Sequence, residues 1–203
     1  MLLLVGVAAL LLGAAVAWIT HSLAPSTGAA SVPGLLWPPP RTLGEFSVVD
    51  HLGQPFDAQR LDGKWSLLFF GFTNCPDVCP NTLRTLQKAV HRLPADTQVV
   101  FVSVDPERDT LEKLAGYVSY FHPAFIGVTG TPAAVDGITR QLGAMHMRAA
   151  GGDAANYNVD HTASIFLIDP RRQMVGVFSQ PITADTLVSA YNGVRRFIEK
   201  QKS

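Results

Sequence analysis

The chain of 203 residues contains two cysteines, Cys75 and Cys79, four positions apart in the segment GFTNCPDVCP (71–80). Such a pair could form a disulfide, hold a metal ion or remain as buried thiols. A structural disulfide stabilises a protein mainly by closing a long loop of the unfolded chain, and this one would close only a few residues. A bridge here would therefore add little stability and would be local and reducible.

A metal ion suits the same spacing better. Two thiolates need only converge on one ion, at about 2.3 Å from each sulfur if zinc–sulfur bonds are the guide. The residues after the pair predict a helix with Leu83, Leu86, Val90 and Leu93 on one face, and Pro80 fits only in its first turn. A helix N-terminus favours thiolates. Two cysteines rarely complete a metal site, so a third ligand is expected from elsewhere.

Histidines are the candidates for that third ligand. His161 is the best placed, because it directly precedes a strongly apolar strand pattern, and strand ends near helix N-termini form the usual site crevice of an α/β sheet. The others are expected in a tether, at a turn, at helix positions or in the segment MHM: His21, His51, His91, His122 and His146.

The segment MHM places His146 between Met145 and Met147. Together these three side chains could attract soft copper. Methionines in such a stretch more often belong to the core, and if the segment is a strand they lie on the face opposite His146.

The predicted elements that position these residues alternate along the chain. Continuous apolar runs at 65–72 and 97–105 predict central strands covered on both faces. Residues 44–64 suggest a hairpin, and a short strand is expected at 125–130. The segments 162–169 and 174–179 predict a second hairpin.

The predicted helices have recognisable ends. Asp109 and Glu112 have the spacing of a capping box for a helix that runs to about Phe121. Thr131 reads as the N-cap of a helix that stops at Gly143, and the last helix is expected from about residue 183. This order predicts an α/β fold with a mixed central sheet. A cysteine pair between the first buried strand and its helix is where a thioredoxin-like fold carries its active cysteines.

Residues 1–40 contain no Asp, Glu, Lys or Arg. Residues 1–20 are predicted to form a transmembrane anchor, because about 20 apolar residues cross a bilayer core. Ala15-Val16-Ala17 also matches a signal-peptide cleavage pattern, although a positively charged n-region is missing. Residues 21–40 predict a Pro/Gly-rich linker without a stable fold. Either interpretation places residues 41–203, the predicted folded domain, outside the cytoplasm.

Acidic and basic residues balance at 16 each, which gives no electrostatic argument for nucleic-acid binding.

Three segments together, GFTNCPDVCPNTL, SVDPERDT and VDHTASIFLIDP, resemble the Sco/SenC family of copper-binding assembly factors for cytochrome c oxidase. The resemblance extends over about residues 44–199. It implies a thioredoxin-like fold with a mixed sheet behind an N-terminal membrane anchor. It also implies that Cys75, Cys79 and His161 are ligands of copper, as Cu(I) and Cu(II).

The function implied by this resemblance is that of a membrane-anchored copper metallochaperone. It would assist assembly of the binuclear copper site in subunit II of cytochrome c oxidase. An upstream copper donor and a thiol reductant would be further partners. A disulfide between Cys75 and Cys79 would be the oxidised, copper-free state.

Two other functions are compatible with a cysteine pair in this position. A thiol–disulfide oxidoreductase usually has two residues between its cysteines, and a cis-proline before the facing strand. Here there are three residues between them and no proline in 159–168. A peroxiredoxin-like peroxidase would have Thr-x-x-Cys, whereas this chain has Thr73-Asn74-Cys75, one residue short.

The segments around the expected ligands carry further charged residues. In VSVDPERDT (102–110) a structural interpretation is favoured, with Asp105 ending a strand and Asp109 capping a helix. Asp160 could orient His161 or could be an exposed turn residue. Asp77 is expected to be a solvated loop charge. The Gly/Ala-rich stretch 148–160 predicts a mobile loop that leads to His161.

Overall fold

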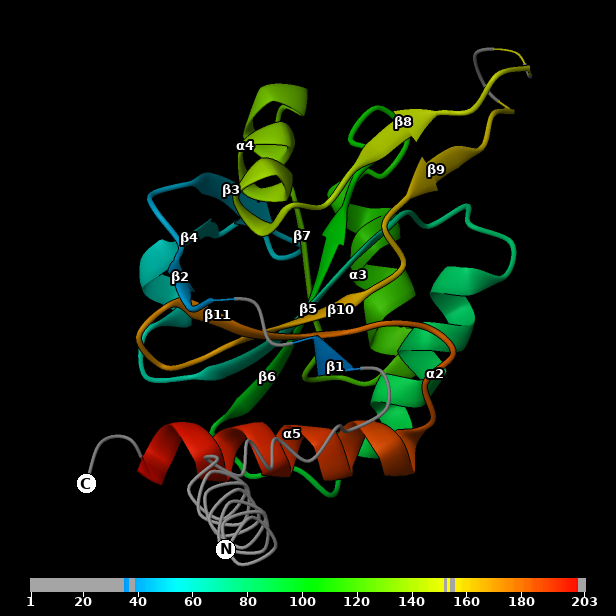
Figure 1. The fold of residues 1–203 in the computed structure, drawn as a ribbon. Helices are drawn as coiled ribbons and strands as arrows, with labels where there is room; N and C mark the ends of the chain where they lie inside the picture. The colour runs from blue at the N-terminus through cyan, green and yellow to red at the C-terminus, as the bar shows by residue number, and fades with distance from the viewer. Residues whose placement is uncertain (1–34, 37–38, 152, 154–155, 201–203) are drawn as a thin grey trace, which may run out of the picture. The chain divides into compact units, whose positions relative to one another are not determined.

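The computed structural model describes residues 35–36, 39–151, 153 and 156–200 (Figure 1). The predicted anchor and most of the predicted linker lie outside these residues. Within the described ranges, no helix combines the length and the apolar character needed to cross a bilayer.

A mixed sheet forms the centre of the described fold. Eight of its nine strands follow the order β1-β11-β10-β5-β6-β7-β3-β4. The ninth strand, β2, also pairs with β11. Only β5, β6 and β7 run parallel to one another, and the other pairings are antiparallel. The strands are β1 (Leu35–Leu36), β2 (Arg41–Thr42), β3 (Ser47–Asp50), β4 (Pro55–Asp57), β5 (Trp65–Gly71), β6 (Thr97–Ser103), β7 (Ile126–Thr129), β10 (Ile165–Ile168) and β11 (Gln173–Phe178).

Helices lie against this sheet as Figure 1 shows. They are α2 (Val78–Val90), α3 (Leu111–Phe121), α4 (Pro132–Leu142) and α5 (Ala184–Lys200), with a short 3₁₀ turn η1 (Ala58–Leu61). The cysteine pair lies between β5 and α2, as the thioredoxin-like prediction requires. Thr131 caps α4 by accepting from the Ala134 N–H, and Gly143 ends that helix with a φ of 67°.

The core confirms the two predicted central strands. All seven residues of β5 are buried, as are the last five of β6. Gly127 in β7 allows α3 to pack closely, since a Cβ at that position would lie 2.6 Å from Leu114 Cγ.

Two predictions about local structure are wrong. Asp109 does not cap α3, because the Thr110 side chain accepts from the Lys113 N–H instead. The predicted linker is also not without structure throughout, since Leu35–Leu36 forms β1 and pairs with β11. A two-residue strand was too short to predict from the apolar pattern.

A second, two-stranded sheet lies apart from the main sheet, at the upper right of Figure 1. It consists of β8 (His146–Arg148) and β9 (Val159–His161), paired antiparallel with His146 opposite His161. The two strands flank the stretch predicted as a mobile loop and overlap its ends, and β9 carries the predicted third ligand.

Candidate metal centre

The two cysteines occupy the connection from β5 to α2. The Cys75 N–H donates to the Phe72 carbonyl over 3.2 Å, so this cysteine lies in a loop before the helix. Cys79 is the second residue of α2, and Pro80 follows it within the first turn, as predicted. Cys75 is half-buried and Cys79 is fully buried.

Cys79 fits against the end of β5 because residue 71 is a glycine. A Cβ on Gly71 would lie 2.8 Å from Cys79 Sγ and 2.8 Å from Phe101 Cε2. Any other residue would collide with the sulfur. The position of Cys79 Sγ is therefore set by the core.

The two sulfurs interact in an unequal way. The Cys79 N–H donates to Cys75 Sγ over 3.3 Å. A hydrogen bond from the Cys79 thiol lowers the pKa of Cys75 to about 4, assisted by His161 and opposed by burial. The same thiol–thiol hydrogen bond, followed by burial, raises the pKa of Cys79. In the metal-free pair the negative charge is therefore favoured on Cys75, the more exposed of the two sulfurs.

His161 completes the group from the end of β9. Its Nε2 lies 3.4 Å from Cys79 Sγ, and its Nδ1 lies 3.2 Å from the Thr162 carbonyl oxygen. A proton on Nδ1 can donate to that carbonyl, which leaves the Nε2 lone pair facing the sulfurs. The rings of Phe69 and Phe72 contact the imidazole edge-on, with centroids 6.1 and 5.9 Å away.

The structure brings the three predicted ligands together. One ligand atom from each of Cys75, Cys79 and His161 lies within 4.8 Å of the other two. Two sulfurs suit a soft monovalent ion, and an added imidazole suits a divalent one such as Cu(II). Both cysteines are free, so the disulfide predicted for the oxidised state is not formed in this structure.

The Thr162 carbonyl, and not Asp160, is the acceptor beside His161. No hydrogen bond between Asp160 and His161 is found in the described part of the chain, and Asp160 is exposed. Asp160 is exposed, as the second interpretation expected, but it lies in the middle of β9 and not in a turn. Asp77, at the start of α2, accepts from the Asn81 side chain and is exposed as predicted.

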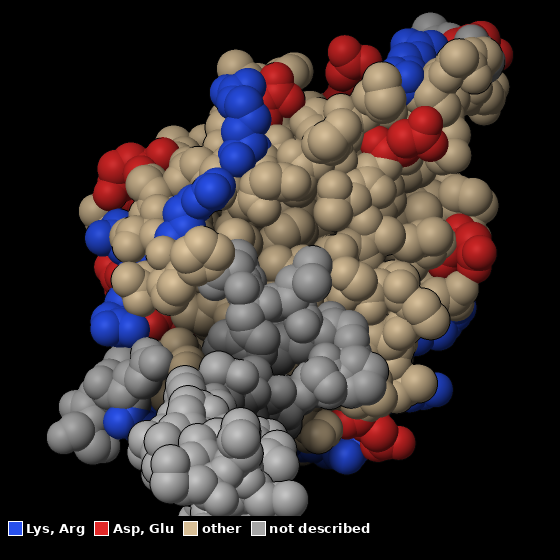
Figure 2. Space-filling model, in the orientation of Figure 1, with Lys and Arg blue, Asp and Glu red and all other residues tan. Residues whose placement is uncertain are grey.

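The methionines of MHM are not core residues. Met145 and Met147 are 73% and 62% exposed, and His146 bonds to Asp136 through Nε2 at 2.9 Å. His146 does not belong to the cysteine–histidine group. Figure 2 shows acidic and basic side chains in the upper right region around β8, whereas the middle of this face is largely uncharged.

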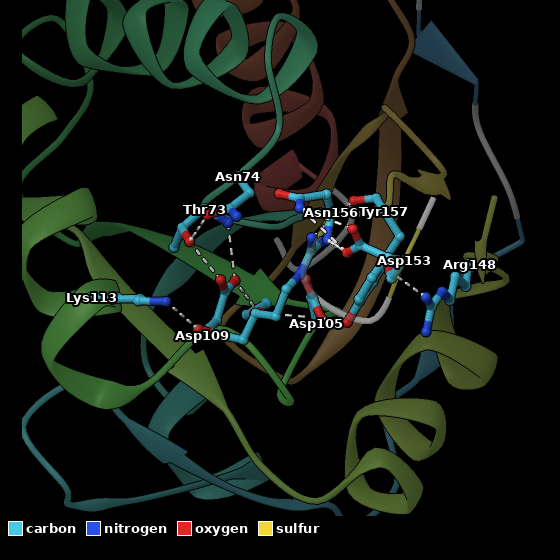
Figure 3. A network of polar contacts seen from close by, with 11 residues as sticks. Thr73, Asn74, Asp105, Asp109, Lys113, Arg148, Asp153, Asn156 and Tyr157 are labelled. Carbon is cyan, nitrogen blue, oxygen red and sulfur yellow. Dashed lines mark hydrogen bonds and ion pairs between the residues drawn. The ribbon is translucent and has the colours of Figure 1, made fainter. Parts of the chain in front are cut away.

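A buried carboxylate holds the loop that carries Cys75 (Figure 3). Asp109 is 1% exposed and accepts from the Thr73 N–H at 3.0 Å, the Thr73 hydroxyl at 2.5 Å and the Ser103 hydroxyl at 2.6 Å. Burial raises the pKa of Asp109, against the opposing effect of these hydrogen bonds. Asp109 therefore fixes the cysteine loop to the end of β6.

Asp105 and Arg108 hold the chain that leads to His161 (Figure 3). Arg108 donates to Asp105 Oδ2 at 2.5 Å and to the Tyr157 carbonyl at 2.9 Å, and its guanidinium lies 3.5 Å from the centre of the Tyr157 ring. The Tyr157 hydroxyl donates to Asp105 Oδ1 at 2.6 Å. Arg148 covers the same ring, 3.9 Å from its centre. The part of this stretch next to β9 is thus held in place at Tyr157.

Sequence reasoning missed this role of Asp105, Arg108, Asp109 and Tyr157. Two signals were available. Four charged side chains follow the buried strand β6, at the edge of the sheet where β5 also ends. Tyr157 is the only aromatic residue in the Gly/Ala-rich stretch 148–160, which indicates a packing role.

Of the remaining histidines, none joins the candidate centre in the described residues. His51 lies at a turn and accepts from the Gly127 N–H. His91 and His122 end α2 and α3, with their rings 5.1 Å apart. His21 lies outside the described residues.

Comparison with known proteins gives consistent matches. A family model described as SCO1/SenC matches residues 38–195. A protein of Stutzerimonas stutzeri whose name describes copper binding is 36% identical over 157 residues, which covers 75% of this chain and 76% of that protein. The mitochondrial SCO2 homologue of Mus musculus is 36% identical over 160 residues. That match covers 76% of this chain but 62% of the mouse protein, which is less than two thirds of its length.

A solved structure matches the fold. The crystal structure of Arabidopsis thaliana ScoI with copper bound has a TM-score of 0.71 and 35% sequence identity. The match covers 75% of this chain and 97% of the Arabidopsis chain.

Proposed function

Because this chain belongs to the SCO1/SenC family, we propose that it is a copper metallochaperone. Copper is the cargo, carried as Cu(I) or Cu(II) by Cys75, Cys79 and His161. The convergence of their ligand atoms within 4.8 Å is the observation that carries the proposal. Relatives support it, since the S. stutzeri protein is named for copper binding and the Arabidopsis structure contains copper.

The chain's own residues prepare the site for this cargo. The lowered pKa of Cys75 favours the thiolate that metal binding requires. Cys79 must lose its proton on binding, and the ion would supply the positive charge that makes this favourable. The Thr162 carbonyl orients the imidazole so that Nε2 faces the sulfurs.

The proposed partner is subunit II of cytochrome c oxidase or another copper-accepting protein, with an upstream copper donor and a thiol reductant. The proposed organisation is an anchor at 1–20, a linker at 21–40 and a folded domain at 41–203. It would place the copper site outside the cytoplasm, tethered to the membrane surface. These proposals rest on the apolar N-terminal sequence and on family membership.

Copper titration of the reduced chain under anaerobic conditions tests the main proposal. We expect one copper per chain and, with Cu(II), absorption from thiolate-to-copper charge transfer. Cys75→Ala, Cys79→Ala and His161→Ala should each weaken binding strongly, and His91→Ala is the control at an exposed histidine outside the group. Unchanged affinity in the His161 variant would contradict the three-ligand site.

A second function, thiol–disulfide exchange, is favoured by one observation. The low pKa of Cys75 and the raised pKa of its buried neighbour are typical of a nucleophilic and a resolving cysteine. Turnover of a generic disulfide substrate, in a preparation that binds no copper, would favour this function over copper carriage.

A further inference from the structure

β9 has one edge paired with β8 and a second edge that no strand of the described chain covers. Hydrogen bonds at both ends of the pairing define which backbone groups face β8. The Thr162 N–H donates to the Met145 carbonyl, and the Ala149 N–H donates to the Asn158 carbonyl, each over 2.9 Å. On β9 the backbone groups that bond to β8 are therefore those of even-numbered residues. Asp160 lies between Asn158 and Thr162, so its backbone also faces β8.

The odd-numbered positions point the other way. Val159 and His161 direct their backbone N–H and C=O groups to the uncovered edge, and within the described residues these groups have no hydrogen-bond partner. The same parity applies to Tyr157, whose carbonyl accepts from the Arg108 guanidinium at 2.9 Å. This edge is thus able to form hydrogen bonds at His161, which is half-buried, and at Val159, which is 6% exposed, and both residues line the groove described next.

A groove of about 200 Å³ lies between this strand and the cysteine loop. Its lining includes Cys75, Val78 and His161, and its charged lining residues are Asp77 and Asp160, with no Lys or Arg. Val78 is 40% exposed. The groove therefore favours an extended, partly apolar occupant that also carries basic residues.

We propose that the uncovered edge of β9 is the docking site for an extended segment of a partner protein, which adds a strand beside Cys75 and His161. The inference rests on the proposed function and specifies how a copper-accepting partner reaches the centre. Strand addition uses backbone hydrogen bonds for affinity and alternate side chains for specificity.

The register also specifies which partner side chain meets the site. A residue that pairs with His161 projects its side chain from the same face of the sheet as the imidazole. That imidazole points at Cys79 Sγ, 3.4 Å away. The partner residue at this position should carry a soft sulfur ligand, Cys or Met, and Lys or Arg elsewhere in the segment should meet Asp77 and Asp160.

Hydrogen exchange on the full chain in detergent micelles, metal-free and reduced, tests the docking mode. The probe is a seven-residue peptide with a central cysteine, valine and threonine on either side, and a lysine at each end. Saturating peptide should slow exchange of the Val159 and His161 amides at least tenfold. The Asp160 amide, already bonded to β8, should change little. No slowing at the two odd positions would overturn the proposal.

Backbone methylation of the peptide provides a test that leaves the protein intact. Two versions carry N-methyl groups at alternate sets of positions. Only one set of N–H groups can face β9, so one version should lose binding and the other should keep it. Equal binding of both versions would mean that the peptide does not add as a strand.

Protein variants locate the contact. Val159→Pro removes an N–H that faces the groove and leaves the bonds to β8 in place, so we expect roughly tenfold weaker peptide binding. Asp77→Asn should weaken binding at low salt, whereas Glu112→Gln, an exposed acid on α3, should not. Equal effects of the two acid substitutions would contradict the assigned groove. Because these experiments use metal-free protein, they test the docking proposal independently of the copper-binding proposal.

Discussion

The two halves of the candidate metal centre are held in different ways. The cysteine half continues directly from the central strand β5 into α2, and Cys79 is packed against Gly71 in the core. The histidine half lies on a two-stranded sheet outside the main sheet and is anchored through Tyr157. Packing thus defines the position of the Cys79 sulfur, whereas polar and stacking contacts hold the segment that carries the imidazole. Substitutions in the two halves should therefore have different consequences.

The largest effect is expected where the core holds Cys79. Gly71→Val would force side-chain atoms into Cys79 Sγ and Phe101, and overpacking of this kind costs about 3 kcal/mol. Urea unfolding should report the lost stability, and copper titration should report a displaced sulfur. Gly116→Ala is the control, because nothing lies within 4 Å of its added Cβ, and in a helix it should stabilise by up to about 1 kcal/mol. Equal stability of the two variants would refute the role of packing.

A smaller effect is expected at the buried carboxylate that holds the cysteine loop. Asp109→Ala removes the acceptor for the Thr73 N–H and leaves it buried, at a cost of about 2 kcal/mol. Denaturant unfolding measures the loss. Asp62→Ala removes a half-exposed carboxylate that pairs with Arg172, and should change stability by less than about 0.5 kcal/mol.

The cost of Asp109→Ala should also depend on pH. Burial raises the folded-state pKa of Asp109 above its unfolded value of about 3.9. The stability linked to this shift is present below the unfolded pKa and is lost as pH rises through the folded pKa. The difference between wild type and Asp109→Ala should therefore narrow as pH rises from 4. A difference that widens would indicate that the hydrogen bonds outweigh burial.

In the histidine half, Tyr157→Phe should have a more local effect. It removes the hydroxyl that donates to Asp105, at a cost of about 1 kcal/mol, and keeps the ring that stacks on Arg108. Hydrogen exchange in β9 should accelerate about fivefold while β5 stays protected. Tyr120→Phe, at a 74% exposed tyrosine, should change neither strand. Faster exchange in both β5 and β9 of the Tyr157 variant would mean that the halves are not separately held.

The smallest effect concerns a pair remote from both halves. A hydrogen bond from Arg195 lowers the pKa of Asp96. The stability that this pair contributes is present above about pH 4 and is lost as pH falls through the lowered folded-state pKa. Arg195→Gln should flatten this acid dependence in unfolding experiments without altering copper affinity. A change in copper affinity would show that the centre is coupled to α5.

The sequence predicted the cysteine half in more detail than the histidine half. Pro80 and the apolar spacing that follows it are local sequence signals. They were sufficient to predict the cysteine loop, the start of α2 and the buried face of that helix. The pairing of His146 with His161 joins two strands of three residues each, 15 positions apart. Strands this short show no clear alternation of apolar and polar residues from which the pairing could be predicted. His161 was selected by its place before β10 and by family resemblance, whereas the Tyr157 anchor depends on the tertiary approach of Arg108.

The brevity of β9 has a consequence for solubility. An uncovered strand edge is a template for unwanted pairing between copies of a chain, and long, flat, apolar edges are the most hazardous. β9 has three residues, so its edge extends only about 10 Å, and Asp160 places an exposed charge at its centre. Such a short, charged edge offers too few hydrogen bonds to nucleate a fibril.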